Sequence, residues 1–331
     1  DLFFFIFTPH KFPNAPLSEQ TYDFSYDGPF NEGDKFVFKV QPIYEGRGVT
    51  LPGAIEYTVY IVQNDKSNIP INRRTFPDPN FLDYVKQFDA NKDGYFSEDE
   101  IANVKTIDVE CHRIRTLGGV EYFTNLTTLK VVGNRLKELD VRNLKSLQVL
   151  DCRSNHEITN LDLSFNHDLQ YVDISINKIE KLDLSNNPEL VHVNVTGNPL
   201  SSLILTDCPN LKVLSLNSTN INNLDSIDLN HCRGLTLLSV AYMDLNSVDV
   251  SMLSNLEELN IESTPIGHID LTQNKALKSL MADNAGITSI DTSTLPNLEY
   301  LAIYRNPLDR IDLSKNPKLR YLDASSCDLS S

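Results

Sequence analysis

The sequence contains no run of about 18 consecutive apolar residues, which is the length that a helix needs to cross a membrane. No transmembrane segment is therefore predicted. Basic residues are also scarce, because 29 Lys and Arg are set against 45 Asp and Glu and leave a net charge of -16. Nucleic acids and anionic membranes both bind clustered Lys and Arg side chains. We therefore expect neither as a partner, and the charge suits a soluble, extracellular or cation-binding protein.

The motifs of the common enzyme classes are missing as well. There is no G-x-S-x-G nucleophile motif, no P-loop, no dinucleotide-binding fingerprint and no H-E-x-x-H zinc motif. The five cysteines form no C-x-x-C pair, which speaks against zinc-ribbon and thioredoxin-like sites. The chain starts at Asp1 without a basic flank, so an export signal or a lipid anchor would lie outside it. We predict that the protein is not an enzyme.

What the sequence has in abundance is an internal repeat. From Val104 onward the pattern L-x-x-L-x-L-x-x-N-x-L-x-x-L-D-L recurs with a spacing of 21 to 24 residues. Such a period predicts a leucine-rich repeat solenoid, in which each repeat adds one short strand and buries its apolar face against its neighbours. The predicted fold class is an α/β repeat, a curved solenoid with a parallel β-sheet on its concave face. Position 0, the first apolar position of each repeat, falls at Val104, Leu126, Leu147, Leu169, Leu190, Leu211, Leu235, Leu256, Leu277, Leu298 and Leu319.

The repeat assigns a direction to each side chain. Positions 0, +3 and +5 are predicted to point into the solenoid, and +2, +4 and +6 to face outward on the concave sheet. Position +8 is Asn in five repeats, where its amide can hydrogen-bond backbone groups of neighbouring turns. Met243, Thr264 and Ala285 interrupt this series, and we expect their corners to be solvated or differently shaped. Cys152 at +5 and Cys327 at +8 are predicted to be buried thiols, with disulfide pairing as the alternative.

The outward positions hold two groups of aromatic residues. Tyr300, Tyr304 and Tyr321 lie at the C-terminal end, while Tyr171 and His192 lie in the middle, beside two aspartates. Exposed rings on a rigid sheet are good anchors for a partner, so these five residues form the predicted binding site. The alternative is that the rings only pack against neighbouring strands.

Residues 1–74 do not follow the leucine-rich repeat pattern. Charged and apolar residues alternate in Lys35–Val40, a second alternating run starts at Ile55, and Gly and Pro separate the two runs. We expect a small β-rich domain of two or more hairpins, followed by a linker at residues 64–68.

Residues 75–103 are predicted to form a helical cap on the first repeat of the solenoid, which spans residues 104–331. Asp78 is a suitable N-cap, and Pro79 fits the first position of a helix because its missing N–H costs nothing there. The residues from Phe81 onward place an apolar stripe on one face of that helix. This stripe would cover the leucines that an open solenoid end exposes.

The cap also contains the one motif with metal chemistry. Residues 89–100 match D-x-[DN]-x-[DN]-G-x5-E, the calcium-binding loop of an EF-hand. We expect a structural Ca²⁺, because sensor EF-hands work as pairs that open. The alternative is a metal-free loop that is held by Asx turns. The predicted ligands are the side-chain oxygens of Asp89, Asn91 and Asp93, the backbone carbonyl of Tyr95, Ser97 directly or through water, and both carboxylate oxygens of Glu100.

These features together resemble a known group of proteins. Residues 147–155 and 161–166 resemble the repeats of internalin-type bacterial surface proteins, particularly those with cysteine-bearing repeats. Residues 76–81, the loop from Asp89 and the Tyr122, Phe123 pair resemble the EF-hand-like cap of secreted or lipid-anchored bacterial leucine-rich repeat proteins. The resemblance covers residues 76–331. It implies an extracellular or cell-surface location and a protein or glycan ligand.

The leading hypothesis is therefore a secreted or surface-anchored bacterial recognition or adhesion protein that binds a protein or glycan on its concave face. A second hypothesis is a structural spacer or surface-layer component without a specific ligand. A third is an accessory carbohydrate-binding protein in which tyrosine rings stack on sugars. A contiguous aromatic or charged patch on the concave face would favour binding, whereas a bland face would favour the spacer.

Overall fold

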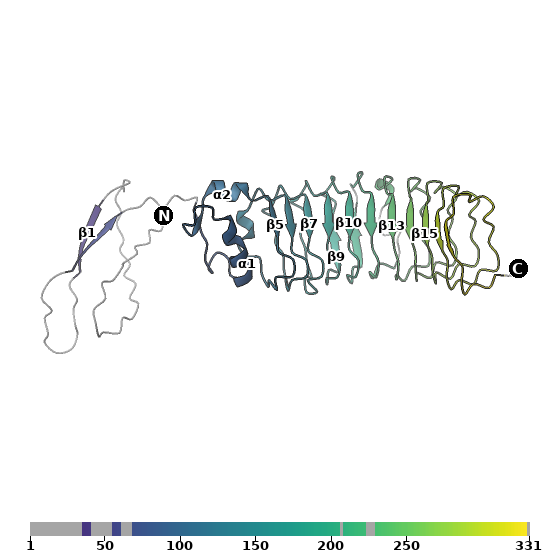
Figure 1. Ribbon diagram of the computed structural model, residues 1–331, viewed down its shortest axis with the longest axis horizontal. Coiled ribbons are helices and arrows are strands. Elements are labelled where there is room, and N and C mark those ends of the chain that lie inside the picture. Colours follow the sequence, from purple (N-terminus) through teal and green to yellow (C-terminus); the bar gives the residue numbers. More distant parts are fainter. Residues whose placement is uncertain (1–34, 41–54, 61–67, 206–207, 223–228, 330–331) are drawn as a thin grey trace, which may run out of the picture. The chain divides into compact units, whose positions relative to one another are not determined.

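The computed structural model describes residues 35–40, 55–60, 68–205, 208–222 and 229–329. The chain divides into two units, Asp1–Lys66 and Ser67–Ser331. In the first unit, β1 (Lys35–Val40) and β2 (Ile55–Tyr60) pair antiparallel, with Lys35 opposite Tyr60 (Figure 1). These strands coincide with the two alternating runs. The remainder of the predicted β-rich domain falls on residues outside the described ones, and so does most of the predicted linker.

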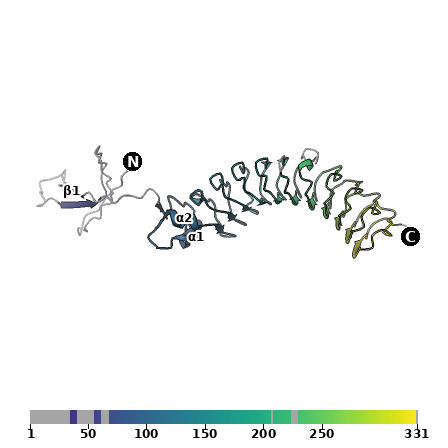
Figure 2. The same cartoon turned by 90° about the horizontal axis from the view of Figure 1, so that it is seen from above.

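The second unit is a leucine-rich repeat solenoid built on one parallel sheet of 11 strands. Neighbouring repeats pair in register, so that equivalent positions stand side by side. Figure 2 shows the repeats following an arc with the strands on its inner side, which confirms the predicted concave sheet. The strands are β5 (Thr106–Asp108), β6 (Thr128–Lys130), β7 (Val149–Asp151), β8 (Tyr171–Asp173), β10 (His192–Asn194), β12 (Val213–Ser215), β13 (Leu237–Ser239), β14 (Glu258–Asn260), β15 (Ser279–Met281), β16 (Tyr300–Ala302) and β17 (Tyr321–Asp323).

The core of the solenoid follows the predicted positions. Leu126, Leu129 and Val131, at 0, +3 and +5 of one repeat, are fully buried. The residues between them are only half-buried and face the concave side. Cys152 is buried as predicted, and this burial raises the pKa of its thiol, which therefore stays protonated. The prediction that Cys327 is buried is wrong, because Cys327 lies in the last described turn and is only half-buried, with its Sγ 3.1 Å from the carbonyl oxygen of Ile303.

The asparagines at +8 connect adjacent turns. Asn134 donates through Nδ2 to the carbonyls of Val109 (2.7 Å) and Val131 (2.9 Å), and its Oδ1 accepts from the Ile114 N–H (3.0 Å). The interrupted corners are buried, so the expectation that they are solvated is wrong. At Thr264 the side-chain hydroxyl takes the place of the Asn amide and donates to the buried Val240 carbonyl (2.7 Å).

A second column of buried polar side chains was not predicted from the sequence. It occupies the position three residues before position 0, where Asn166, Asn187, Asn274 and Asn316 are all buried. Asn187, for example, donates to the carbonyls of Leu163 (3.0 Å) and Asn166 (2.9 Å). The same position holds Cys208 and Cys232 in two consecutive repeats, and both are buried. The sequence does contain a signal for this column, because the repeat period relates equivalent positions in the turn segments as well as in the strands.

Each repeat turns away from the sheet at position +7, where the backbone adopts the left-handed conformation. Gly133 and Gly197 adopt it without strain. Ile176 and Tyr242 adopt it too, each at φ 57°, which is unfavourable for a β-branched or bulky side chain.

The remaining elements line the side of the solenoid away from the concave sheet or join repeats. A two-stranded parallel sheet consists of β9 (Lys181–Asp183) and β11 (Ser202–Ile204). Short 3₁₀ turns are η2 (Val120–Tyr122) and η4 (Leu229–His231). No helix in the described ranges is long and apolar enough to cross a membrane.

The cap lies at the N-terminal end of the solenoid, beside β5 (Figure 1). Its elements are β3 (Ile69–Pro70), α1 (Pro79–Val85), η1 (Lys86–Phe88), β4 (Tyr95–Phe96) and α2 (Glu98–Asn103).

The start of α1 and the packing of the cap follow the prediction. The Asp78 carboxylate caps α1 by accepting from the N–H groups of Asn80 (2.9 Å) and Phe81 (3.2 Å). The rings of Phe76 and Phe96 pack edge to face, with centroids 5.8 Å apart, so an aromatic core closes this end.

The domain boundary differs from the one predicted at residue 74. Because β3 pairs with β4, residues 69–70 belong to the cap, and the two units separate between Lys66 and Ser67. The sequence pattern missed this pairing because each strand has only two residues, too few to show alternation.

Candidate functional site

The concave face holds the predicted aromatic residues in two stacked pairs. The ring centroids of Tyr171 and His192 are 4.5 Å apart with an interplanar angle of 13°. Those of Tyr300 and Tyr321 are 4.3 Å apart with an angle of 4°. Each pair forms because its members share position +2 in neighbouring strands. The rings do pack across strands, as the alternative proposed, and yet the Tyr321 side remains open, with 44% of the residue exposed.

Tyr304 stands apart from the stacked pair. It lies at +6 of the repeat that contains Tyr300, and its N–H donates to Asp283 Oδ1 at 2.7 Å. The guanidinium carbon of Arg305 lies 5.2 Å from the centroid of the Tyr304 ring, a cation–π contact. Tyr304 therefore lies beyond the end of β16, and only Tyr300 and Tyr321 stack.

The middle of the concave face contains an ion-pair cluster beside Tyr171 and His192. Arg153 Nη1 lies 3.1 Å from Asp151 Oδ2 and 3.6 Å from Asp173 Oδ2, and both carboxylates are buried. Asp173 also accepts hydrogen bonds from side chains on its own and the next strand. Burial raises the pKa of Asp151 and lowers the pKa of His192. One arginine thus offsets two buried acids, and the imidazole is neutral at neutral pH.

The predicted calcium loop folds through hydrogen bonds among its own residues. Gly94 N–H donates to Asp89 Oδ2 (3.0 Å), Asp93 N–H donates to Asn91 Oδ1 (2.9 Å), and Tyr95 N–H donates to Asp93 Oδ1 (2.8 Å). Gly94 has φ 84°, a left-handed turn that suits glycine. These bonds close the loop on itself.

Two further residues complete the loop. Ser97 and Glu100 form a capping box at the start of α2, with the Ser97 N–H 2.9 Å from Glu100 Oε2. Glu100 Oε1 accepts from the Ala90 N–H at 2.8 Å. The Ser97 N–H and hydroxyl bonds lower the pKa of Glu100, which is therefore an anion at neutral pH. Glu100 thus ties the end of the loop to its beginning.

One atom in the loop lacks a partner. Asp89 Oδ1 is buried and accepts no hydrogen bond. This is the residue in the first ligand position, so the donor set fits an oxygen-seeking cation such as Ca²⁺. The carboxylates of the loop do not form a ligand shell, however. Within the described ranges, no three His, Cys, Asp or Glu side chains lie close enough together to hold a metal ion. Glu100 would have to give up backbone hydrogen bonds to close the ligand shell.

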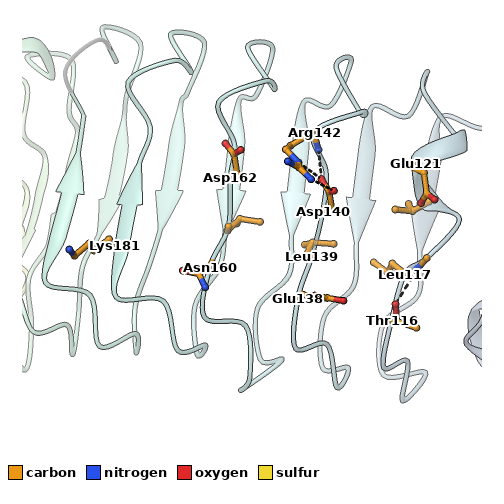
Figure 3. Close-up of a pocket in the computed structure, with 13 residues that line it drawn as sticks. Thr116, Leu117, Glu121, Glu138, Leu139, Asp140, Arg142, Asn160, Asp162 and Lys181 are labelled. Carbon is orange, nitrogen blue, oxygen red and sulfur yellow. Dashed lines mark hydrogen bonds and ion pairs between the residues drawn. The ribbon is translucent and has the colours of Figure 1, made fainter.

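A pocket of about 470 Å³ lies elsewhere, on the side of the solenoid that carries β9 (Figure 3). Leu117, Leu139 and Leu161 contribute its apolar lining. Arg142 lies among acidic residues of the pocket and donates to both carboxylate oxygens of Asp140, at 3.0 and 2.7 Å. Sequence reasoning missed this pocket. The available signal was Arg142 itself, since the equivalent position after the turn aspartate is Ser or Thr in most other repeats.

Comparison with known proteins supports the fold. No protein-family model and no curated protein matches the sequence. Among solved structures, the functional domain of InlJ from Listeria monocytogenes, described as including a cysteine ladder, is 24% identical with a TM-score of 0.52. It aligns over 80% of this chain and 73% of that chain. The leucine-rich repeat domain of APL1B is 20% identical, aligns over 67% of each chain and has a TM-score of 0.57.

A plant receptor shows the same fold with a bound partner. The ectodomain of the receptor kinase GASSHO1/SCHENGEN3 from Arabidopsis thaliana, in complex with CASPARIAN STRIP INTEGRITY FACTOR 2, is 19% identical with a TM-score of 0.53. The alignment covers 65% of this chain and 32% of that one. These likenesses show that the fold is a leucine-rich repeat solenoid.

Proposed function

We propose that this protein is a secreted or surface-anchored bacterial recognition protein that binds a protein or glycan partner on its concave face. The observation that carries the proposal is the Tyr300–Tyr321 stack, which presents aromatic surface on a rigid sheet. Aromatic side chains with few rotatable bonds lose little entropy on binding, and a sheet holds them in place. The Tyr171–His192 stack provides a second anchor on the same face.

A matched pair of variants tests the location of the site. The full chain is first screened against glycan arrays and displayed proteins to obtain a ligand. Replacing Tyr300 and Tyr321 by Ala should then weaken binding by about tenfold or more. The control replaces Tyr122 and Phe165, two exposed aromatics off the concave face, and should leave affinity unchanged. Equal affinity in both double variants would remove the C-terminal pair from the site.

The bacterial surface location is tested separately. Intact cells of the source organism would be labelled with antibody against the chain, and membrane and culture fractions would be probed. Signal at the cell surface or in the medium is expected. Signal confined to the cytoplasmic fraction would contradict the proposed location.

We also propose that residues 89–100 bind a structural Ca²⁺. The buried Asp89 Oδ1, which no hydrogen bond satisfies, supports this proposal, because a cation would provide the missing partner. Ca²⁺ at about 100 times its Kd should stabilise the cap by about 2.7 kcal/mol relative to chelator.

Thermal melts and calcium titration of two variants make this test specific. Glu100→Gln should abolish the calcium-dependent shift of the melting midpoint. Asp99→Asn is the matched control, because this neighbouring carboxylate has no place in the ligand set, and it should keep the shift. A wild-type midpoint that is the same in calcium and in chelator would contradict the proposal.

A further inference from the structure

We propose that the C-terminal half of the concave face binds a cationic segment of a partner protein, one that carries Arg or Lys side chains. This inference deepens the function proposed above and rests on the concave sheet being the binding face.

The charge along the concave sheet favours a cationic partner. From β13 to β17, the outward positions +2, +4 and +6 carry four carboxylates, Glu258, Glu262, Asp283 and Asp323, and no Lys or Arg. The N-terminal half differs, because Lys130 and Arg153 stand at these positions among its own four carboxylates, Asp108, Glu110, Asp151 and Asp173. Arg153 lies between Asp151 and Asp173, and Lys130 lies 3.9 Å from Asp108. The C-terminal half therefore has the larger net negative charge at these positions, -4 against -2 for the N-terminal half, which has two cations among its four acids.

Two nearby cations are engaged away from these positions. Lys278 pairs with Glu257 at 2.7 Å and Arg320 approaches Glu299 at 3.9 Å, all four at position +1 of their repeats. In the ion pairs of the described residues, none of the four concave carboxylates has a cationic partner. Glu262 accepts a hydrogen bond from the Tyr242 hydroxyl, which does not remove its charge.

The carboxylates also act on one another. Asp283 stands next to Glu262 in the +6 column, and Asp323 lies two repeats further on. Burial raises the pKa of Asp283, and the charges of Asp323 and Glu262 raise it further. Placing a cation among like charges relieves this repulsion, so the site gains more from a cation than a single surface acid would.

The tyrosines add a second, independent preference for a cation. The face of an aromatic ring attracts ammonium and guanidinium groups, and guanidinium also stacks on it. Arg305 already occupies this geometry on Tyr304, which shows that a guanidinium at this surface settles over a tyrosine ring. The Tyr300–Tyr321 stack, with Tyr321 exposed, offers an equivalent surface to an incoming Arg. A neutral glycan would stack on the rings and donate hydroxyl hydrogen bonds to the carboxylates, but it would not offset their negative charge.

The test uses the full chain and a fluorescein-labelled peptide of alternating Gly and Arg, with the Gly–Gln peptide of equal length as the uncharged probe. Fluorescence anisotropy should show binding of the Arg peptide only. Affinity should fall about tenfold or more between about 50 mM and about 300 mM NaCl. A Gly–Lys peptide should bind more weakly than the Arg peptide, because ammonium does not stack.

Charge-matched variants separate a site from a general attraction to an acidic protein. Glu262→Gln with Asp283→Asn should lower affinity about tenfold. Asp270→Asn with Asp291→Asn removes the same charge from exposed turn aspartates on another side of the solenoid, where Asn can still cap the turn, and should change affinity less than about twofold. Melting curves of both variants confirm that they fold.

Several outcomes would overturn the proposal. These are an equal loss in the two double variants, no binding of the Arg peptide, or equal binding of the Arg and Gln probes. A screened ligand that needs Tyr300 and Tyr321 but ignores both salt and the Glu262, Asp283 change would also overturn it while leaving the proposed function intact. A screened ligand that ignores the tyrosines as well would contradict both proposals.

Discussion

The two ends of the solenoid are built differently. At the N-terminal end, Phe76, Phe81 and Phe96 of the cap are fully buried against the first repeats. At the C-terminal end, Leu322 is 43% exposed, although its equivalent one repeat earlier, Leu301, is fully buried. Both leucines occupy position +3 of the same motif. Identical sequence positions therefore have different environments, because a repeat is buried only by what stacks on it.

This difference bears on both stability and binding. Repeats in the interior gain an interface on each side, whereas the last described turn gains only one. Tyr321, in the same described turn, is 44% exposed. Core truncations should therefore measure how far an interior turn and the end turn differ.

The largest effect is expected from truncating interior core leucines. Leu214→Ala should lower the free energy of unfolding by about 2–5 kcal/mol, because Leu214 is fully buried and the cavity cannot close. Leu322→Ala should cost less than about 1 kcal/mol, since much of that side chain already meets water. Denaturant titration of the two variants gives the comparison. Similar losses would show that the end turn is as well supported as the interior.

A smaller effect is expected in the second asparagine column. Asn187→Ala should cost about 1–3 kcal/mol, because it leaves the carbonyls of Leu163 and Asn166 buried without donors. Asn316→Ala, at the last described member of this column, should cost less, because the turn that follows it is partly exposed, with Leu322 at 43%. Thermal melts at one protein concentration would rank the two. A loss at Asn316 that equals the one at Asn187 would contradict the contrast between the ends.

The smallest expected effect has the opposite sign. Ile176→Gly should stabilise the protein by up to about 1 kcal/mol, because glycine adopts the left-handed φ of 57° without the strain of a β-branched residue. Ser326→Gly, the same position in the last described repeat, should change the midpoint by less than Ile176→Gly does. Calorimetry on both variants tests this. A destabilised Ile176→Gly would mean that Ile176 contributes more through contacts than it costs in strain.

The errors in the sequence analysis have one physical origin. It identified the inward positions correctly because burial of a leucine in a strand depends on the period alone. It missed Asn187 and its column, and expected a solvated or differently shaped corner at Thr264, because hydrogen bonds between turns depend on which carbonyls face inward. It placed a domain boundary at residue 74 because the pairing of β3 with β4 joins segments about 25 residues apart. Such contacts produce no periodic pattern in the amino-acid sequence.

The sequence by itself determined the solenoid, its 21-residue spacing, the concave sheet and the ligand pattern of residues 89–100, since each follows from local spacing and residue type. Only the tertiary structure decided which outward residues meet. It stacked Tyr300 on Tyr321, placed Arg153 between two acids in the N-terminal half, and left Glu262, Asp283 and Asp323 without a cation. The physical reason is that stacking and charge compensation act between repeats, at distances set by strand pairing, whereas the sequence motif acts within each repeat.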